Sequence, residues 1–242
     1  MLRLIFPLIV CAAFLGPAPA AHSAPIHDFN AAVFKAYGHY REALFYLRGG
    51  NVQVASFELE EMTTQWKLIV GKFADTPPDV FSADPAWRQV LLDIDKSAVS
   101  SLEAAINNDA KEARKLLAPV RGMLSALRRR NGVINFSDYV DQANAAFDKL
   151  WVYRSNPPDV DSPKQIDQLR RIVAVTAHLY EMVQDNAPTA VRDNPEFKRL
   201  MGTSLDAFRK MRGAITARKV DALISILRGQ SSSNRMLFLR FG

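Results

Sequence analysis

The sequence predicts an all-α protein made of two tandem up-down-up-down four-helix bundles. Two observations lead to this prediction. Apolar residues recur three and four positions apart along most of the chain, as they do on the buried face of an amphipathic helix. The whole pattern then repeats with a period of 110, so the chain divides into copies at 27–136 and 137–242. No segment sustains the alternation of apolar and polar residues that is typical of a half-buried strand.

Glycine and proline residues divide the first copy into four predicted helices. Their apolar stripes cover residues 29–47, 55–73, 87–105 and 113–127. Gly49-Gly50 ends the first helix, because glycine adopts the left-handed backbone of a helix C-terminus without steric cost. Pro85 suits the first turn of the third helix, where its missing N–H costs nothing. Pro119 lies inside the fourth helix and should kink it.

The second copy follows the first in the same register. Its helices are predicted at residues 139–153, 163–184, 195–216 and 219–241. Apolar residues that align when the two copies are superimposed include Leu59/Leu169, Trp87/Phe197, Leu117/Leu227 and Leu127/Leu237. Long helices joined by short turns bury such stripes best as a bundle. An array of two-helix repeats is the competing architecture, but helices of about 20 residues are too long for a repeat of about 34 residues.

Residues 1–24 have the layout of a cleaved export signal. Arg3 precedes an apolar run over residues 4–15, and small residues follow, so cleavage is expected after one of residues 20–24. The run is too short for a membrane anchor, which needs about 20 apolar residues. It also continues past Cys11, where the run of a lipoprotein signal would end. We therefore expect a periplasmic protein that loses its only cysteine and works in an oxidising compartment.

The charge balance limits the classes of partner. The chain has 242 residues, with 31 Lys and Arg against 25 Asp and Glu, and a formal charge of +6. This basic excess is mild, and export separates the protein from nucleic acid, so we expect no nucleic-acid partner. Beyond the signal no stretch approaches a membrane span, so we expect no stable membrane insertion after cleavage.

The motifs of common catalytic sites are missing from the sequence. There is no Gly-x-Ser-x-Gly elbow, no glycine-rich phosphate loop and no His-Glu-x-x-His pair. Acidic pairs such as Glu58 and Glu61 lie between apolar stripe residues, where a solvated helix face explains them. No pair of histidines has the spacing of a metal site on a helix. We expect a protein that is not an enzyme and has no metal site.

The second copy contains four features in a fixed order. They are Asn194-Pro-Glu-Phe197, a long amphipathic helix, a short polar turn and an apolar stripe from Ala222 to Leu227. This order resembles the C-terminal half of the cytochromes c-prime, which are exported four-helix bundles. In that family one haem is attached through Cys-x-x-Cys-His near the end of the fourth helix. The matching positions here are Asn234, Leu237 and Phe238 in the second copy and Leu124, Leu127 and Arg128 in the first. None carries a thiol or an imidazole, so covalent haem is excluded and the family's electron transfer and gas binding do not carry over.

Non-covalent haem is the alternative that the resemblance leaves open. A related exported bundle binds haem through a Met on its first helix and a His on its fourth. Here the arrangement is reversed, with His39 on a first helix and Met123 on a fourth, while the second copy offers His178. The alternative function is therefore an electron-transfer protein that binds haem or a metal non-covalently through these residues. A surface or boundary position is the simpler explanation for each histidine.

The leading prediction is an exported, non-enzymatic helical-bundle protein without covalent haem that acts as a binding or accessory protein for a periplasmic protein partner. Arg128-Arg129-Arg130 closes the fourth helix of the first copy, where basic residues interact favourably with the helix dipole. The same three arginines are the candidate surface for an acidic partner. A protein-binding adaptor that uses this end of the first bundle is the third alternative.

Overall fold

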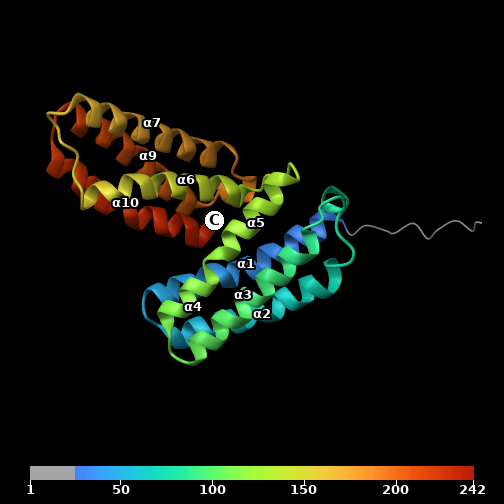
Figure 1. Ribbon diagram of the computed structural model, residues 1–242. Coiled ribbons are helices and arrows are strands. Elements are labelled where there is room, and N and C mark those ends of the chain that lie inside the picture. Colours follow the sequence, from blue (N-terminus) through green and yellow to red (C-terminus); the bar gives the residue numbers. More distant parts are fainter. Residues whose placement is uncertain (1–24) are drawn as a thin grey trace, which may run out of the picture.

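The computed structural model describes residues 25–242, and all regular structure within them is helical. The all-α prediction is confirmed. The predicted export signal, residues 1–24, lies outside the described residues. Figure 1 shows two groups of long helices, α1 to α4 in blue and green and α6 to α10 in yellow to red, with α5 extending from the first group toward the second.

The helices begin and end close to the residues that predicted their limits. The first group contains α1 (Ile26–Arg48), α2 (Val52–Phe73), η1 (Asp79–Phe81), α3 (Trp87–Ile106), α4 (Ala110–Leu117) and α5 (Pro119–Arg130). The second contains α6 (Phe136–Trp151), η2 (Val152–Arg154), α7 (Pro163–Asp185), α8 (Thr189–Arg192), α9 (Pro195–Thr216) and α10 (Val220–Phe241).

The two predicted prolines have different outcomes. Pro119 interrupts the predicted fourth helix: Ala118 before it keeps helical dihedral angles, with φ of −53° and ψ of −35°, and the ring takes the first position of α5, where no N–H is needed. Pro85 is predicted in the first turn of α3, but that helix begins at Trp87 and Pro85 lies in the preceding turn.

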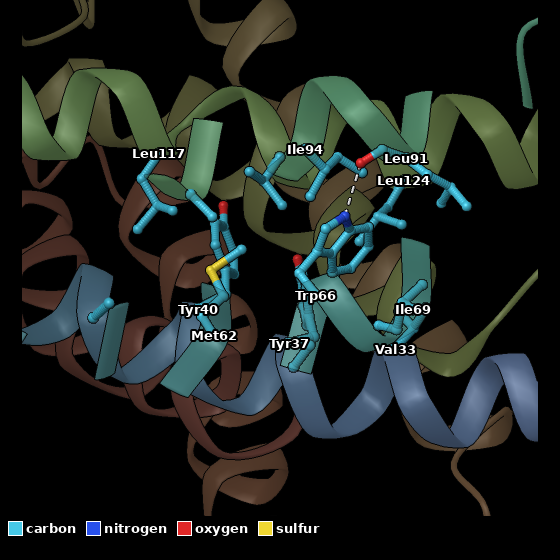
Figure 2. Close-up of a cluster of buried hydrophobic side chains, with 14 of the residues drawn as sticks. Val33, Tyr37, Tyr40, Met62, Trp66, Ile69, Leu91, Ile94, Leu117 and Leu124 are labelled. Atoms are coloured by element: carbon cyan, nitrogen blue, oxygen red, sulfur yellow. Dashed lines mark hydrogen bonds between the residues drawn. The ribbon is translucent and has the colours of Figure 1, made fainter. Parts of the chain in front are cut away.

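The first group packs around one hydrophobic core to which α1, α2, α3, α4 and α5 all contribute buried side chains. Trp66 of α2 is its largest fully buried residue. The Trp66 Nε1 donates a hydrogen bond of 2.8 Å to the Leu91 main-chain oxygen on α3 (Figure 2). This bond satisfies the only polar atom of the indole ring, as its burial requires.

The second group has a separate core formed by α6, α7, α9 and α10. Tyr180 and Phe208 meet edge to face with ring centroids 4.8 Å apart, and Phe197 meets Phe241 in the same way at 5.3 Å. Edge-to-face contacts are a favoured geometry of aromatic rings. The first contact joins α7 to α9, and the second holds the end of α10 against α9.

Helix boundaries in the two groups recur at positions that the predicted period makes equivalent. The short helices η1 and α8 begin at one such pair, Asp79 and Thr189. Asn108 and Arg218 are another pair, and both have a left-handed backbone, with φ of 60° and 53°. Residues other than glycine adopt this conformation only where a turn requires it. The same strained turn therefore precedes α4 in one group and α10 in the other.

The two cores differ in a layer of polar side chains. Four buried apolar residues of the first copy have buried polar counterparts at the equivalent positions of the second: Trp66/Thr176, Ile94/Ser204, Val120/Gln230 and Leu124/Asn234. In the second core Tyr180 Oη donates a hydrogen bond of 2.5 Å to Asn234 Oδ1, and Gln230 Nε2 donates one of 2.8 Å to Ser204 Oγ. Hydrogen bonds in the second core thus replace part of the apolar packing of the first.

Replacing Trp66 by Ala should lower the free energy of unfolding by about 3–5 kcal/mol, because the substitution leaves a cavity in the first core. Urea denaturation followed by circular dichroism measures this loss. Phe57 lies on the same helix but is 69% exposed, so Phe57→Ala should change the free energy of unfolding by less than about 0.5 kcal/mol. Equal losses for the two variants would contradict the assignment of the buried face of α2.

Candidate binding sites at the junction of the two helix groups

Helices α1 and α5 of the first group meet α6 and α10 of the second (Figure 1). Phe238 of α10 packs against the first core, and the Arg121 guanidinium of α5 lies 4.8 Å from the centroid of its ring. Within residues 25–242 four charged residues are buried, and all of them lie at this junction: Arg41, Arg128, Asp138 and Asp141. Charged groups are rarely buried without partners, so the contacts of these residues define the junction.

Arg128 and Asp138 form a buried ion pair that joins α5 to α6. Arg128 Nη2 donates a hydrogen bond of 2.6 Å to Asp138 Oδ1, and its Nε donates one of 2.8 Å to Oδ2, which is the bidentate arrangement. Asp138 Oδ2 also accepts a hydrogen bond of 2.9 Å from the Asn135 main-chain N–H and so caps the N-terminus of α6. The pair therefore fixes the start of the second group relative to the first.

A second charge pair, Arg121 and Asp141, lies in the same junction. Arg121 Nε is 2.7 Å from Asp141 Oδ1, and its Nη2 donates a hydrogen bond of 3.0 Å to the Asp141 main-chain oxygen. The Nε–H does not point at the carboxylate, so both carboxylate oxygens are buried without a hydrogen bond. Burial raises the pKa of Asp141, and the charge of Arg121 opposes that shift. The contact is therefore a charge attraction of poor hydrogen-bond geometry.

Arg41 of α1 is the third cation at the junction. Its Nη1 donates a hydrogen bond to the main-chain oxygen of Gly242, directly after α10, while its Nε is buried without a partner. Burial lowers the pKa of Arg41. This contact ties the end of α10 to the middle of α1.

The three arginines predicted as a partner surface have different environments. Arg128 is 5% exposed and its guanidinium is engaged by Asp138. Arg130 Nε donates a hydrogen bond of 2.6 Å to Asp84 Oδ2. Arg129 is exposed and forms no ion pair within residues 25–242. The structure thus does not bring the three side chains together on one free surface, and only Arg129 is placed as the prediction requires.

The residues predicted for non-covalent haem also lie apart. His39 Nδ1 is 2.8 Å from Glu58 Oε2, so its ring bridges α1 and α2 at a half-buried position. Met123 is partly buried against the first core. His178 belongs to α7 of the second group, and its side chain is 67% exposed. No group of three potential metal ligands occurs within residues 25–242.

An apolar cleft of about 390 Å³ lies at the junction, beside the first half of α1. Its apolar walls are formed by Val33, Phe34, Ile134, Phe136, Val191 and Phe241. Phe34 is 73% exposed and Ile134 is 64% exposed. Arg240 also lines the cleft, and its Nε is 3.9 Å from Glu196 Oε2. Residues of both helix groups therefore surround one apolar opening with a guanidinium in its wall.

A second cavity, of about 340 Å³, lies at the junction beside the last turns of α1. Three arginines line it, Arg48 of α1, Arg121 of α5 and Arg235 of α10, and we call it the arginine cavity. Asn144 and Asp148 of α6 contribute an amide and a carboxylate. No local sequence pattern indicates either cavity, although the basic residues that line this one are visible in the sequence.

Comparison with protein-family models, curated proteins and solved structures gives no match for this chain. The resemblance to the cytochromes c-prime therefore stays a prediction. At the positions of that family's motif, Leu124, Leu127 and Leu237 are buried core residues, and Asn234 accepts the hydrogen bond of Tyr180. None of the helices in the described part of the chain has the length and apolar character needed to span a bilayer.

Replacing Arg128 by Ala should lower the free energy of unfolding by about 3–5 kcal/mol, because Asp138 would remain buried without its partner. Arg129→Ala, one residue further along α5, removes an exposed guanidinium and should cost less than about 0.5 kcal/mol. The double variant Arg128→Met, Asp138→Asn removes both charges and should recover part of the loss. Urea denaturation measures all three, and a loss for Arg128→Ala no larger than that for Arg129→Ala would show that the pair does not stabilise the junction.

Proposed function

We propose that the protein is a tandem duplication of a four-helix bundle, exported to the periplasm, and that it acts there as a non-enzymatic binding or accessory protein. Three features of the described residues support the duplication. Each helix group has its own hydrophobic core, the helix boundaries recur at equivalent positions, and Asn108 and Arg218 form the same left-handed turn. One bundle consists of α1, α2, α3 and the broken helix α4–α5, and the other of α6, α7, α9 and α10.

The apolar cleft is the observation that carries the binding role. Phe34 and Ile134 expose most of their surface beside an opening of about 390 Å³. Burying such surface contributes about 25 cal/mol per Å², so a partner that covers both side chains gains free energy that the free protein does not have. The walls of the cleft come from both bundles. Neither bundle contains this site by itself. The proposed duplication would therefore create a binding site that a single bundle lacks.

The lining of the cleft favours an apolar segment of a partner protein that carries an acidic residue. Arg240 supplies a guanidinium, and its contact with Glu196 at 3.9 Å is at the outer limit of an ion pair. Arg128 also lines the cleft, but Asp138 engages its guanidinium, which leaves Arg240 as the cation for an acidic residue. Complementary charge beside an apolar contact is the arrangement that gives a binding surface its specificity.

A photo-crosslinking amino acid in place of Phe34 should form an adduct with a periplasmic partner in cells. Phe57 is comparably exposed on α2 but lies outside the cleft, so the same substitution there should form none. Arg240→Glu should lower the yield of the Phe34 adduct at least about tenfold, because a carboxylate in the cleft repels an acidic partner. Immunoblotting and mass spectrometry measure the adducts. Equal yields at positions 34 and 57 would reject the cleft as the partner site.

Export predicts a defined N-terminus for the mature protein. When the full chain is expressed, the protein should be recovered from the periplasmic fraction and begin at one of residues 21–25, because cleavage is expected after one of residues 20–24. N-terminal sequencing determines this position. Arg3→Glu should reduce the exported fraction, because a positive n-region is part of the signal. A protein that retains Met1 and stays in the cytoplasm would refute the export proposal.

A further inference from the structure

We propose that the arginine cavity binds a small organic carboxylate that has an apolar body and a hydrogen-bond donor. This site is separate from the apolar cleft, so the inference does not depend on the proposed protein partner. It rests on guanidinium groups without counter-ions, on a buried amide without a hydrogen-bond partner and on the apolar part of the cavity wall.

Arg48 and Arg235 are exposed residues that bring positive charge to the cavity. Neither side chain forms an ion pair with a carboxylate of residues 25–242, and the carboxylate in the lining, that of Asp148, lies beyond ion-pair distance of both. Burial lowers the pKa of Arg48, the nearby charges of Arg114 and Arg235 lower it further, and the charge of Asp148 opposes the shift. These guanidinium groups therefore repel one another. An anion between them would replace that repulsion with charge-assisted hydrogen bonds.

The helix dipole explains only one of these arginines. Arg48 is the last residue of α1, where the negative end of the dipole favours a cation. Arg235 lies within α10, more than a turn before its end at Phe241, and gains little from that effect. Arg121, the third guanidinium in the wall, is already paired with Asp141. The position of Arg235 near Arg48 is thus unexplained by helix stability.

Asn144 provides the second, independent observation. Its side chain lines the cavity and is 5% exposed, yet its Oδ1 accepts no hydrogen bond. A buried acceptor without a partner costs about 1–3 kcal/mol, so such groups are uncommon in folded proteins. The other amide in the wall, that of Asn234, is satisfied by the hydroxyl of Tyr180. A ligand that donates a hydrogen bond to Asn144 would remove the deficit.

The remaining wall includes apolar surface that a bare inorganic anion would leave uncovered. Leu44, Phe147, Trp151 and Phe238 supply apolar and aromatic surface. A volume of about 340 Å³ is at the lower end of the range for small-molecule sites and exceeds the needs of a phosphate or sulfate ion. The cavity therefore fits one carboxylate near Arg48 and Arg235, an apolar body against the rings and a donor near Asn144.

Isothermal titration calorimetry of the purified mature protein with four probes tests this assignment. 4-Hydroxybenzoate carries the carboxylate, the ring and the donor, and should bind. Benzoate lacks the donor, 4-hydroxybenzyl alcohol lacks the charge and inorganic phosphate lacks the apolar body. Each should bind at least about tenfold more weakly, because each leaves one of the three features without a partner.

Variants locate the site. Arg48→Gln and Arg235→Gln should each weaken 4-hydroxybenzoate binding at least about tenfold. Arg228→Gln is the matched control, since Arg228 is exposed on the same helix as Arg235, forms no ion pair within the described residues and lies outside the cavity. Asn144→Ala should abolish the preference for 4-hydroxybenzoate over benzoate. Circular dichroism confirms that each variant is folded.

Three results would overturn the inference. One is the absence of 4-hydroxybenzoate binding at millimolar concentration, and another is binding that Arg48→Gln and Arg235→Gln leave unchanged. The third is inorganic phosphate binding as strongly as 4-hydroxybenzoate, which would show a general anion site without a role for the apolar wall. A failure of photo-crosslinking at Phe34 has no bearing on these measurements, so the two proposals fail separately.

Discussion

The buried ion pair between Arg128 and Asp138 is the constraint on which the junction of the two helix groups depends. Both charges are removed from water, so each requires the other, and the bidentate geometry allows little freedom in how the two planar groups meet. The same carboxylate caps α6, which links the ion pair to the first turn of the second group. The direction in which α6 leaves the first group is therefore set at its first residues. Both cavities lie along the junction that results.

The charged contacts at the junction determine orientation more than stability. Taking a charge out of water costs several kcal/mol, and the attraction of a partner returns about as much when the geometry is good. Arg121 and Asp141 have poorer geometry than Arg128 and Asp138, and Arg41 retains a donor without a partner. The stability of each group instead comes from its apolar core. A junction of this kind positions the two helix groups relative to each other and leaves two cavities beside it.

Much of the fold could be predicted because helix periodicity and helix ends are local properties. Short stretches of sequence contain the apolar stripe from Phe29 to Leu47, the glycines after it and the break at Pro119. The structure places helix limits beside the glycines and the proline. The predicted repeat rests on the same local signals, since apolar residues and turn residues recur at the same spacing in the two parts of the sequence.

The candidate sites could not be predicted in the same way. Arg128, Arg129 and Arg130 look alike in the sequence, and only the packing of α5 against α6 separates a buried ion-pair member from an exposed side chain. The pattern Asn135-x-x-Asp138 is typical of a helix N-terminus, but it does not indicate that its acid faces Arg128. The arginine cavity combines residues of four helices, from Leu44 on α1 to Phe238 on α10, and no local pattern contains that information.

The polar layer in the second core is a difference between the two helix groups that packing alone does not explain. The first copy has apolar residues at the same positions, among them Leu124 where the second has Asn234, so this helix arrangement folds without the polar groups. Burying them costs desolvation that apolar residues would avoid. Asn234 belongs to both the polar layer and the wall of the arginine cavity, and Tyr180 holds its amide in place from within the core. The hydrogen bonds of the second core therefore position one wall of the cavity. The ligand proposed for the arginine cavity would explain why the second core contains buried polar residues that do not stabilise it.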